Sequence, residues 1–336
     1  MTYPKIELHV HLDSAIRPAL LLRLARRNDH VLPFATVEEF ADYCRVATFP
    51  DLGRVWVETC GVLKREQDFR EVLVAYAGEA KSHGAVYVEA IFNPWMMWRS
   101  GISLDAIFTG YCDAIEEARG LHGVEVRLTP DGDLWATPEE AAEIARYAVA
   151  YRDRGVVGFG MSGNDRKVNP EAFARAAEIA RDGGLGFTPH AGEFGGAHLV
   201  RIAIETLGAS RVRHGLGAIE DPALMREAAD RGIGFDICLI SNVRLGAAPS
   251  FEEHPITSFV AAGIHCSVSS DDPALLDTDL ERDHAAARSL GLTPKQLYDA
   301  AIAGVLCDNE TKLALHALAE SYDWSSTPTA PMTSAT

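Results

Sequence analysis

Basic residues are scarce in this chain of 336 residues, and this narrows the range of its partners. It has 31 Lys and Arg against 48 Asp and Glu, a formal net charge of −17. Nucleic acids and anionic membranes attract proteins through basic surfaces. We therefore expect no binding to nucleic acid or to a membrane, and a small neutral or cationic molecule as the partner.

Cysteines and long apolar runs are also few. The six cysteines are scattered, without a C-x-x-C pair, and are too sparse for a disulfide scaffold, so we expect buried thiols. No apolar run approaches the ~20 residues that a membrane-spanning helix needs. The first ten residues also lack the basic stretch and apolar run of an export signal. These absences predict a cytoplasmic protein, and nothing in the sequence predicts its oligomeric state.

Strand and helix patterns alternate along most of the chain. Short β-branched runs are followed by amphipathic helical patterns such as PEEAAEIARYAVAYRDR and PEAFARAAEIARD. Eight such units predict an α/β fold, the (β/α)₈ or TIM barrel. The predicted strands are Lys5–His11, Ala85–Ile91, Val124–Leu128, Val156–Met161, Gly186–His190, Arg211–His214, Gly234–Cys238 and Ile264–Ser269.

Two segments depart from this alternation. Residues 17–82 contain several helical patterns between the first two strands, where extra helices lie over the C-terminal face of a barrel, so we predict a lid. Residues 325–336 are small and polar without apolar periodicity, which predicts a disordered tail. Residues 1–324 are expected to form a single barrel domain.

Polar clusters follow four of the predicted strands. They are the histidines of ELHVHLD, then HAGE (190–193), RHG (213–215) and SSDDP (269–273). His9 and His11 are two residues apart in a strand and so project from the same side. Barrel strands deliver such residues to one site at their C-terminal ends.

The residue types at these strand ends suit a metal centre. Three imidazoles and a carboxylate favour zinc, which lowers the pKa of a water molecule to about 7. We predict one zinc ion per chain, held by His9, His11, His190 and Asp271. Glu193, His214 and Asp272 remain to transfer protons and to bind substrate.

Taken together, PKIELHVHLD, HAGE, RHG and SSDDP resemble the adenosine deaminase family of the amidohydrolase superfamily, over about residues 4–320. The resemblance implies hydrolytic removal of the amino group of adenosine or 2′-deoxyadenosine, which releases ammonia. It implies that Glu193 protonates the purine N1 and that His214 orients and deprotonates the attacking water. Asp271 would also hydrogen-bond this water.

The resemblance also implies the contacts with substrate. Asp272 would contact N7 of the purine, the backbone N–H of Gly163 would contact N3, and Asp13 would hold the 5′-hydroxyl of the ribose. Asp13 therefore favours a nucleoside with a free 5′-hydroxyl. Adenine, 6-aminodeoxyfutalosine and adenosines changed at N6 or at the sugar remain alternatives.

Two other classes of protein fit these motifs less well. A non-catalytic binding relative would be expected to have lost a metal ligand or the proton donor, and this chain retains them all. The other class of zinc deaminases has H-x-E followed by P-C-x-x-C, a pattern that is absent here.

Two features have no assigned role in this family pattern. Arg213 stands before His214 where the family usually has Gly, and strand alternation predicts that its side chain points outward, away from the site. The segment Trp95–Trp98 carries two Trp and two Met. It could be an exposed apolar patch, a wall of the substrate pocket, or packing against the lid helices.

Overall fold

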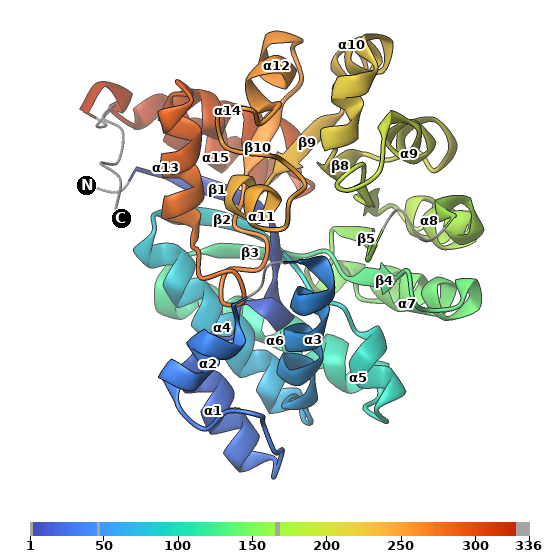
Figure 1. Ribbon diagram of the computed structural model, residues 1–336, viewed down its shortest axis with the longest axis vertical. Coiled ribbons are helices and arrows are strands. Elements are labelled where there is room, and N and C mark those ends of the chain that lie inside the picture. Colours follow the sequence, from blue (N-terminus) through green and yellow to red (C-terminus); the bar gives the residue numbers. More distant parts are fainter. Residues whose placement is uncertain (1–2, 46–47, 165–168, 327–336) are drawn as a thin grey trace.

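The computed structural model describes residues 3–45, 48–164 and 169–326 of the chain. Its strands lie at the centre, with helices around them (Figure 1). The strands are β1 (Lys5–His11), β2 (Ala85–Ile91), β3 (Glu125–Leu128), β4 (Asp131–Asp133), β5 (Gly158–Ser162), β6 (Gly186–Phe187), β7 (His190–Ala191), β8 (Arg211–His214), β9 (Gly234–Ile237) and β10 (Cys266–Val268).

The strands pair in parallel and in sequence order around a ring. Three sheets hold β1-β2-β3, β4-β5-β6 and β7-β8-β9-β10. A bridge between Leu128 and Val156 joins β3 to the segment that leads into β5. A second bridge, between Val10 of β1 and Asp271, which follows β10, closes the ring. The predicted barrel is confirmed, and each of its eight predicted strands overlaps at least one observed strand.

Two of the eight barrel strands are interrupted by proline. Pro130 separates β3 from β4, and Pro189 separates β6 from β7. Proline has no N–H to donate to a neighbouring strand, so the ladder breaks there. The proline carbonyls still accept, from Gly160 N at 3.0 Å and from Arg213 N at 3.0 Å. The eight predicted strands therefore appear as ten short ones.

The two predicted helical patterns form α7 (Pro138–Ala150) and α8 (Ala174–Asp182). α7 begins with a capping box, because Thr137 accepts from Glu140 N and Glu140 accepts from Thr137 N. Its apolar face is buried. The other helices after β2 are α5 (Trp95–Arg99), α6 (Leu104–His122), α9 (Ala197–Arg201), α10 (Pro222–Asp230), α11 (Leu239–Arg244), α12 (Ile256–Ala261), α13 (Leu280–Ser289), α14 (Pro294–Gly304) and α15 (Asn309–Ser321).

The segment 17–82 contributes four helices, drawn in blue in Figure 1. They are α1 (Pro18–Arg27), α2 (Val37–Tyr43), α3 (Phe49–Gly61) and α4 (Glu66–Ser82). α4 packs along α6, as the first crossover helix of a barrel should. α3 contributes side chains to the pocket described below, so it is the part of this segment that fits the expected lid.

Three further expectations concern the chain as a whole. Of the predicted tail, Ser325 and Ser326 end a short helical turn, and positions 327–336 lie outside the described residues. All six cysteines are free thiols, and only Cys44 and Cys307 are not fully buried. Among the described residues, no helix combines the length and apolar character needed to cross a membrane.

Candidate active site

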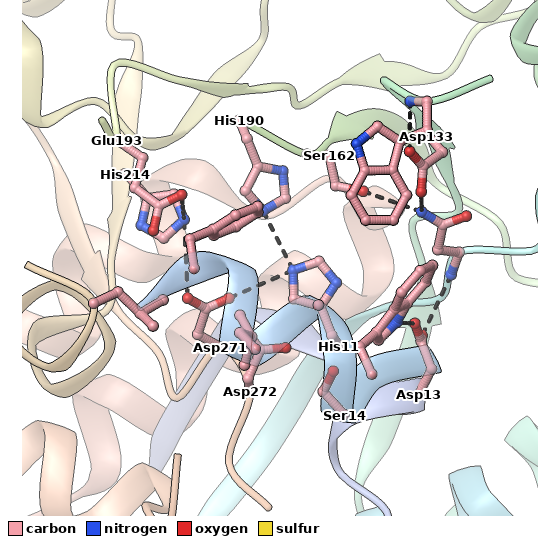
Figure 2. Close-up of a pocket in the computed structure, with 18 residues that line it drawn as sticks. His11, Asp13, Ser14, Asp133, Ser162, His190, Glu193, His214, Asp271 and Asp272 are labelled. Carbon is pink, nitrogen blue, oxygen red and sulfur yellow. Dashed lines mark hydrogen bonds and ion pairs between the residues drawn. The ribbon is translucent and has the colours of Figure 1, made fainter. Parts of the chain in front are cut away.

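A pocket opens at the C-terminal ends of the strands, where the sequence predicted the site. It encloses about 680 Å³, counting the space at its open mouth. Eight of the nine predicted site residues line it, and most of them are labelled in Figure 2. The ninth, His9, is fully buried against its neighbours. The structure therefore brings all nine together.

The four predicted metal ligands converge on one point. The Nε2 atoms of His9, His11 and His190 lie 3.1 to 3.4 Å from one another. Asp271 Oδ1 lies 3.0 Å from His9 Nε2 and 3.4 Å from His11 Nε2. Ligands about 2.0 to 2.1 Å from a tetrahedral zinc ion stand roughly 3.3 Å apart. The four atoms thus have the spacing of a zinc ligand set.

The protonation of the imidazoles also fits a metal. Burial lowers the pKa of His11 to about 4, and it lowers the pKa of His9 and His190 well below the usual value. All three rings are therefore neutral at neutral pH. His190 Nδ1 lies 2.8 Å from the Met161 carbonyl oxygen, to which it can only donate, so its Nε2 lone pair faces the cluster.

Two candidate catalytic groups lie beside the ligands. His214 Nε2 is 3.8 Å from Glu193 Oε2 and 3.9 Å from Asp271 Oδ2. The other carboxylate oxygen of Asp271, Oδ1, is the one that faces His9 and His11. His214 and Asp271 both have left-handed backbone, with φ of 63° and 64°. Such a conformation costs a non-glycine residue about 1 to 3 kcal/mol and is typical of functional sites.

A buried chain of hydrogen bonds sets the tautomer of His214. The backbone N–H of Ile256 donates to His254 Nδ1 (3.2 Å), so the neutral His254 ring carries its proton on Nε2. That Nε2–H donates to Asn242 Oδ1 (3.1 Å), which turns the Asn242 amide nitrogen toward His214 Nδ1 (3.0 Å). His214 Nδ1 is therefore an acceptor, and its Nε2–H faces the pocket. The sequence analysis did not single out His254, because its link to His214 exists only through these spatial contacts.

The surroundings of Asp272 favour the protonated form of its carboxyl group. Burial, and then the nearby Asp271, raise its pKa well above the usual value. A raised pKa favours the carboxylic acid form, which can donate a hydrogen bond, whereas N7 of a purine can only accept one. Gly163 lines the same pocket with φ of 126°, a conformation that favours glycine.

The predicted orientation of Arg213 is wrong. Its side chain is fully buried in the barrel, where it binds Asp131 Oδ1 (2.5 Å) and Thr129 Oγ1 (3.0 Å). The positive φ of His214 breaks the strand alternation on which the prediction relied. Gly160 makes room for this pair, because a Cβ there would lie 2.4 Å from Arg213 Nη1.

The segment Trp95–Trp98 packs and does not line the pocket. It forms most of α5, with Met97 buried and both Trp side chains partly buried against the core. Trp95 Nε1 donates to Glu140 (3.2 Å), and α5 contacts α3. Packing against the predicted lid is thus the alternative that the structure favours. Asn93, two residues before this segment, does line the pocket, as does Asp133, and the sequence analysis singled out neither.

The family model described as adenosine deaminase matches residues 4–320. The chain belongs to the adenosine deaminase family. Membership confirms the expected enzyme class, a hydrolase that acts on C–N bonds of cyclic amidines. It also confirms the resemblance inferred from the four motifs.

Two relatives named for different substrates are similar to this chain. An aminodeoxyfutalosine deaminase from Acidothermus cellulolyticus is 46% identical over 331 residues, 96% of this chain and 93% of that protein. An adenine deaminase from Chelativorans sp. is 35% identical over 321 residues, 93% and 97% of the two chains.

Solved structures agree in fold. An amidohydrolase from Burkholderia ambifaria with bound Zn has a TM-score of 0.85 and 29% identity, covering 95% of this chain and 90% of that one. Arabidopsis ADAL complexed with IMP has a TM-score of 0.84 and 25% identity, covering 95% and 96%.

Proposed function

We propose that this protein is a zinc-dependent deaminase of an adenine nucleoside modified at the sugar, of the aminodeoxyfutalosine kind. The observation that carries the chemistry is the convergence of four ligand atoms beside Glu193 and His214. Zinc held by His9, His11, His190 and Asp271 supplies a Lewis acid that makes water nucleophilic near neutral pH. A related structure with bound Zn supports the choice of metal.

The protein groups then have distinct tasks. Glu193 donates a proton to purine N1 as the oxygen of water adds to C6. His214 donates its Nε2–H to that oxygen, and Asp271 Oδ2 takes the proton that the water loses. This proton passes to the amino group, which leaves as ammonia, and the hydroxyl proton on C6 returns to Glu193 as the carbonyl forms. In this scheme the base is Asp271, where the sequence assigned that role to His214.

Substrate binding uses the other predicted residues. Protonated Asp272 donates to N7, and the backbone N–H of Gly163 donates to N3. The ring is thereby held with C6 toward the metal ligands and N9, which bears the sugar, toward the mouth of the pocket.

The substrate is the point on which this proposal departs from the sequence analysis. Adenosine was favoured there because Asp13 resembled a residue that holds a 5′-hydroxyl. The 46% identity to an aminodeoxyfutalosine deaminase, with adenine deaminases next, supports the alternatives better. The two carboxylate oxygens of Asp13 accept hydrogen bonds from Trp56 Nε1 and Asn93 N. These contacts give Asp13 a structural role that does not depend on a 5′-hydroxyl.

Ammonia release from four compounds tests the proposed reaction. Aminodeoxyfutalosine, adenosine, 2′-deoxyadenosine and adenine would each be incubated with the zinc-loaded enzyme. We expect the highest kcat/KM for aminodeoxyfutalosine. A higher value for adenosine would restore the original choice, and Asp13→Ala should then harm adenosine far more than adenine.

Loss of one ligand tests the metal site independently of substrate. His9→Ala should abolish zinc retention in a chain that still folds, because His9 is the most deeply buried ligand. Zinc content by mass spectrometry is the measurement, and unaltered zinc would reject the ligand set.

A further inference from the structure

The first and last strands of the barrel meet beside the proposed metal ligands. Strand β1 carries His9 and His11, and Asp271 lies just after β10. The backbone N–H of His11 donates to the Asp271 carbonyl (2.8 Å), and the backbone N–H of Asp271 donates to the His9 carbonyl (3.1 Å). Three of the four ligands therefore lie at the junction that closes the barrel, so the alignment of the two strands decides whether they converge.

Two serines of the SSDDP motif join β1 to the chain that follows β10. Ser269 Oγ accepts from the backbone N–H groups of Leu8 and His9, each at 3.1 Å. Ser270 donates twice to Glu7 Oε1, through its backbone N–H (3.0 Å) and through its hydroxyl (2.6 Å). Neither serine takes part in the proposed chemistry, and nor does Glu7, so these contacts need another explanation.

Glu7 and Ser270 form a buried polar pair. Glu7 is fully buried, and Ser270 is 1% exposed. The second carboxylate oxygen of Glu7, Oε2, accepts from the hydroxyl of Tyr76 on α4. Burying a carboxyl group is costly, and apolar residues of similar volume are often at least as stable in its place. Hydrogen bonds fix direction as well as distance, so this pair indicates that the chain at Ser270 has to be held in one orientation.

The residue after Ser270 needs this support. Asp271 has left-handed backbone, with φ of 64°. A non-glycine residue keeps such a strained conformation only where its surroundings impose it. Ser270 fixes the chain on the N-terminal side of Asp271, and β1 binds the backbone N–H and carbonyl of Asp271 itself. In this conformation Asp271 Oδ1 faces His9 and His11, and Oδ2 faces His214 (Figure 2).

We infer that Glu7 and Ser270 are positioning residues, whose buried hydrogen bonds hold Asp271 in the conformation that completes the metal-ligand set. They act through Asp271 and not on the substrate. The inference rests on the proposed function, because that function makes Asp271 both a zinc ligand and the base. Loss of this contact should therefore weaken zinc binding and lower kcat, while the groups that bind the substrate stay in place and KM changes little.

Ser270→Ala removes the hydroxyl and leaves the backbone contact. We expect the Kd for zinc to rise by about 10- to 100-fold, the size typical of residues that orient a metal ligand. Ser267→Ala is the matched control, because the hydroxyl of Ser267 on β10 also donates to a buried carboxylate, Asp236 Oδ1 (2.7 Å). It should change this Kd less than about threefold. Competition with a chromophoric chelator measures both values, and equal changes in the two variants would overturn the inference.

Two substitutions of Glu7 distinguish hydrogen bonding from packing. Glu7→Gln keeps an oxygen that can accept from Ser270, so it should retain the wild-type Kd within about threefold. Glu7→Leu has no acceptor and leaves the Ser270 donors unpaired, so it should weaken zinc binding at least as much as Ser270→Ala.

The two losses should also overlap. Ser270→Ala should add little in the Glu7→Leu background, because both changes break the same contact, and full additivity would contradict a shared task. Circular dichroism of the metal-free variants shows whether each chain folds. If Glu7→Leu does not fold, Glu7→Gln and the two serine variants decide the question.

The visible spectrum of the cobalt(II)-loaded protein reports the ligand geometry. Ser270→Ala should change its bands, since a displaced Asp271 carboxylate alters the coordination, whereas Ser267→Ala should leave them as in wild type. Ser270→Ala should also lower kcat by about 10-fold or more, with KM within about threefold. A loss of folding stability with unchanged cobalt spectrum, zinc Kd and kcat would make Glu7 and Ser270 merely structural.

Metal binding needs no substrate, so it separates this inference from the proposed reaction. Weaker zinc binding in Ser270→Ala than in Ser267→Ala supports the positioning role even if no aminopurine is deaminated. Equal zinc binding in these two variants overturns the role even if the wild type is an active deaminase. A wild type that binds no zinc overturns both.

Discussion

The side-chain amide nitrogen of Asn242 lies 3.0 Å from Nδ1 of His214, the ring nitrogen that faces away from Glu193. Because this amide nitrogen donates, the proton of neutral His214 resides on Nε2, inside the pocket. The hydrogen bond between these two residues thus decides whether His214 gives or takes a hydrogen bond at the reacting water.

Asn242→Asp should reverse this hydrogen bond. A carboxylate at position 242 accepts from Nδ1–H, which moves the neutral proton of His214 away from the pocket. We expect kcat to fall at least about 100-fold while zinc content is unchanged, as for other misdirected catalytic imidazoles. Ser241→Ala is the control, because Ser241 is buried next to Asn242. An unchanged or higher kcat in Asn242→Asp would return the role of base to His214.

Glu193→Gln should separate proton donation from binding. Glu193 lies at the pocket wall outside the ligand cluster, and glutamine keeps its shape but cannot donate a proton to N1. We expect normal zinc content, KM within about threefold, and a loss of about 10² to 10⁴ in kcat. Steady-state kinetics with parallel metal analysis is the measurement. A kcat within tenfold of wild type would exclude Glu193 as the donor.

Gly160→Ala should destabilise the barrel through the buried ion pair. The added Cβ would lie 2.3 Å from Asp131 Oδ1 and 2.4 Å from Arg213 Nη1, so it forces the pair apart. Separating a buried pair costs about 3 to 5 kcal/mol, and we expect a loss of this size in the free energy of unfolding by denaturant. Gly120→Ala is the control, since a Cβ there meets no atom within 4 Å. Equal stability of the two variants would contradict the role of Gly160.

Asp283→Asn should change how stability depends on pH. Burial raises the pKa of Asp283 from 3.8 to about 8, although it accepts from Ile240 N and Thr278 Oγ1, each at 3.0 Å. The folded chain therefore keeps a proton that the unfolded chain releases above about pH 4. The stability that this proton provides is fully present below pH 4 and is lost as pH rises through 8.

Asparagine at position 283 does not titrate, so the variant does not lose this part of its free energy of unfolding as pH rises. Between pH 5 and 8 the variant should gain up to about 1.4 kcal/mol per pH unit relative to wild type. Denaturant unfolding of both proteins at several pH values gives this difference directly. A difference that stays constant with pH would contradict the raised pKa.

Local patterns were enough to predict the barrel. Strand β1 at Lys5–His11 and strand β8 at Arg211–His214 have the predicted bounds, because β-branched runs and strand-end polar residues are local signals. The splits at Pro130 and Pro189 could also have been read from the sequence, since proline cannot donate to a ladder.

The site was predictable only where its residues lie in motifs. His9, His11, His190 and Asp271 occur in short polar clusters at strand ends, and the structure gathers them. Asn242 and His254 are twelve residues apart and meet through side chains alone, which no periodicity indicates. The direction of Arg213 depended on a single backbone angle at His214, and strand alternation cannot anticipate it.

The buried pair of Arg213 and Asp131 also gives a criterion for sorting sequences of this family. An arginine before the histidine of the RHG motif needs both an acid three barrel strands away and a glycine at position 160. We expect Asp131, Gly160 and Arg213 to be replaced together in homologues. A homologue with glycine in place of Arg213 should therefore tolerate a residue larger than glycine at position 160. Counting how often the residues at positions 131, 160 and 213 change together in aligned homologues would test this expectation. Residues that change together would then assign a new sequence to a branch of the family before any enzyme is assayed.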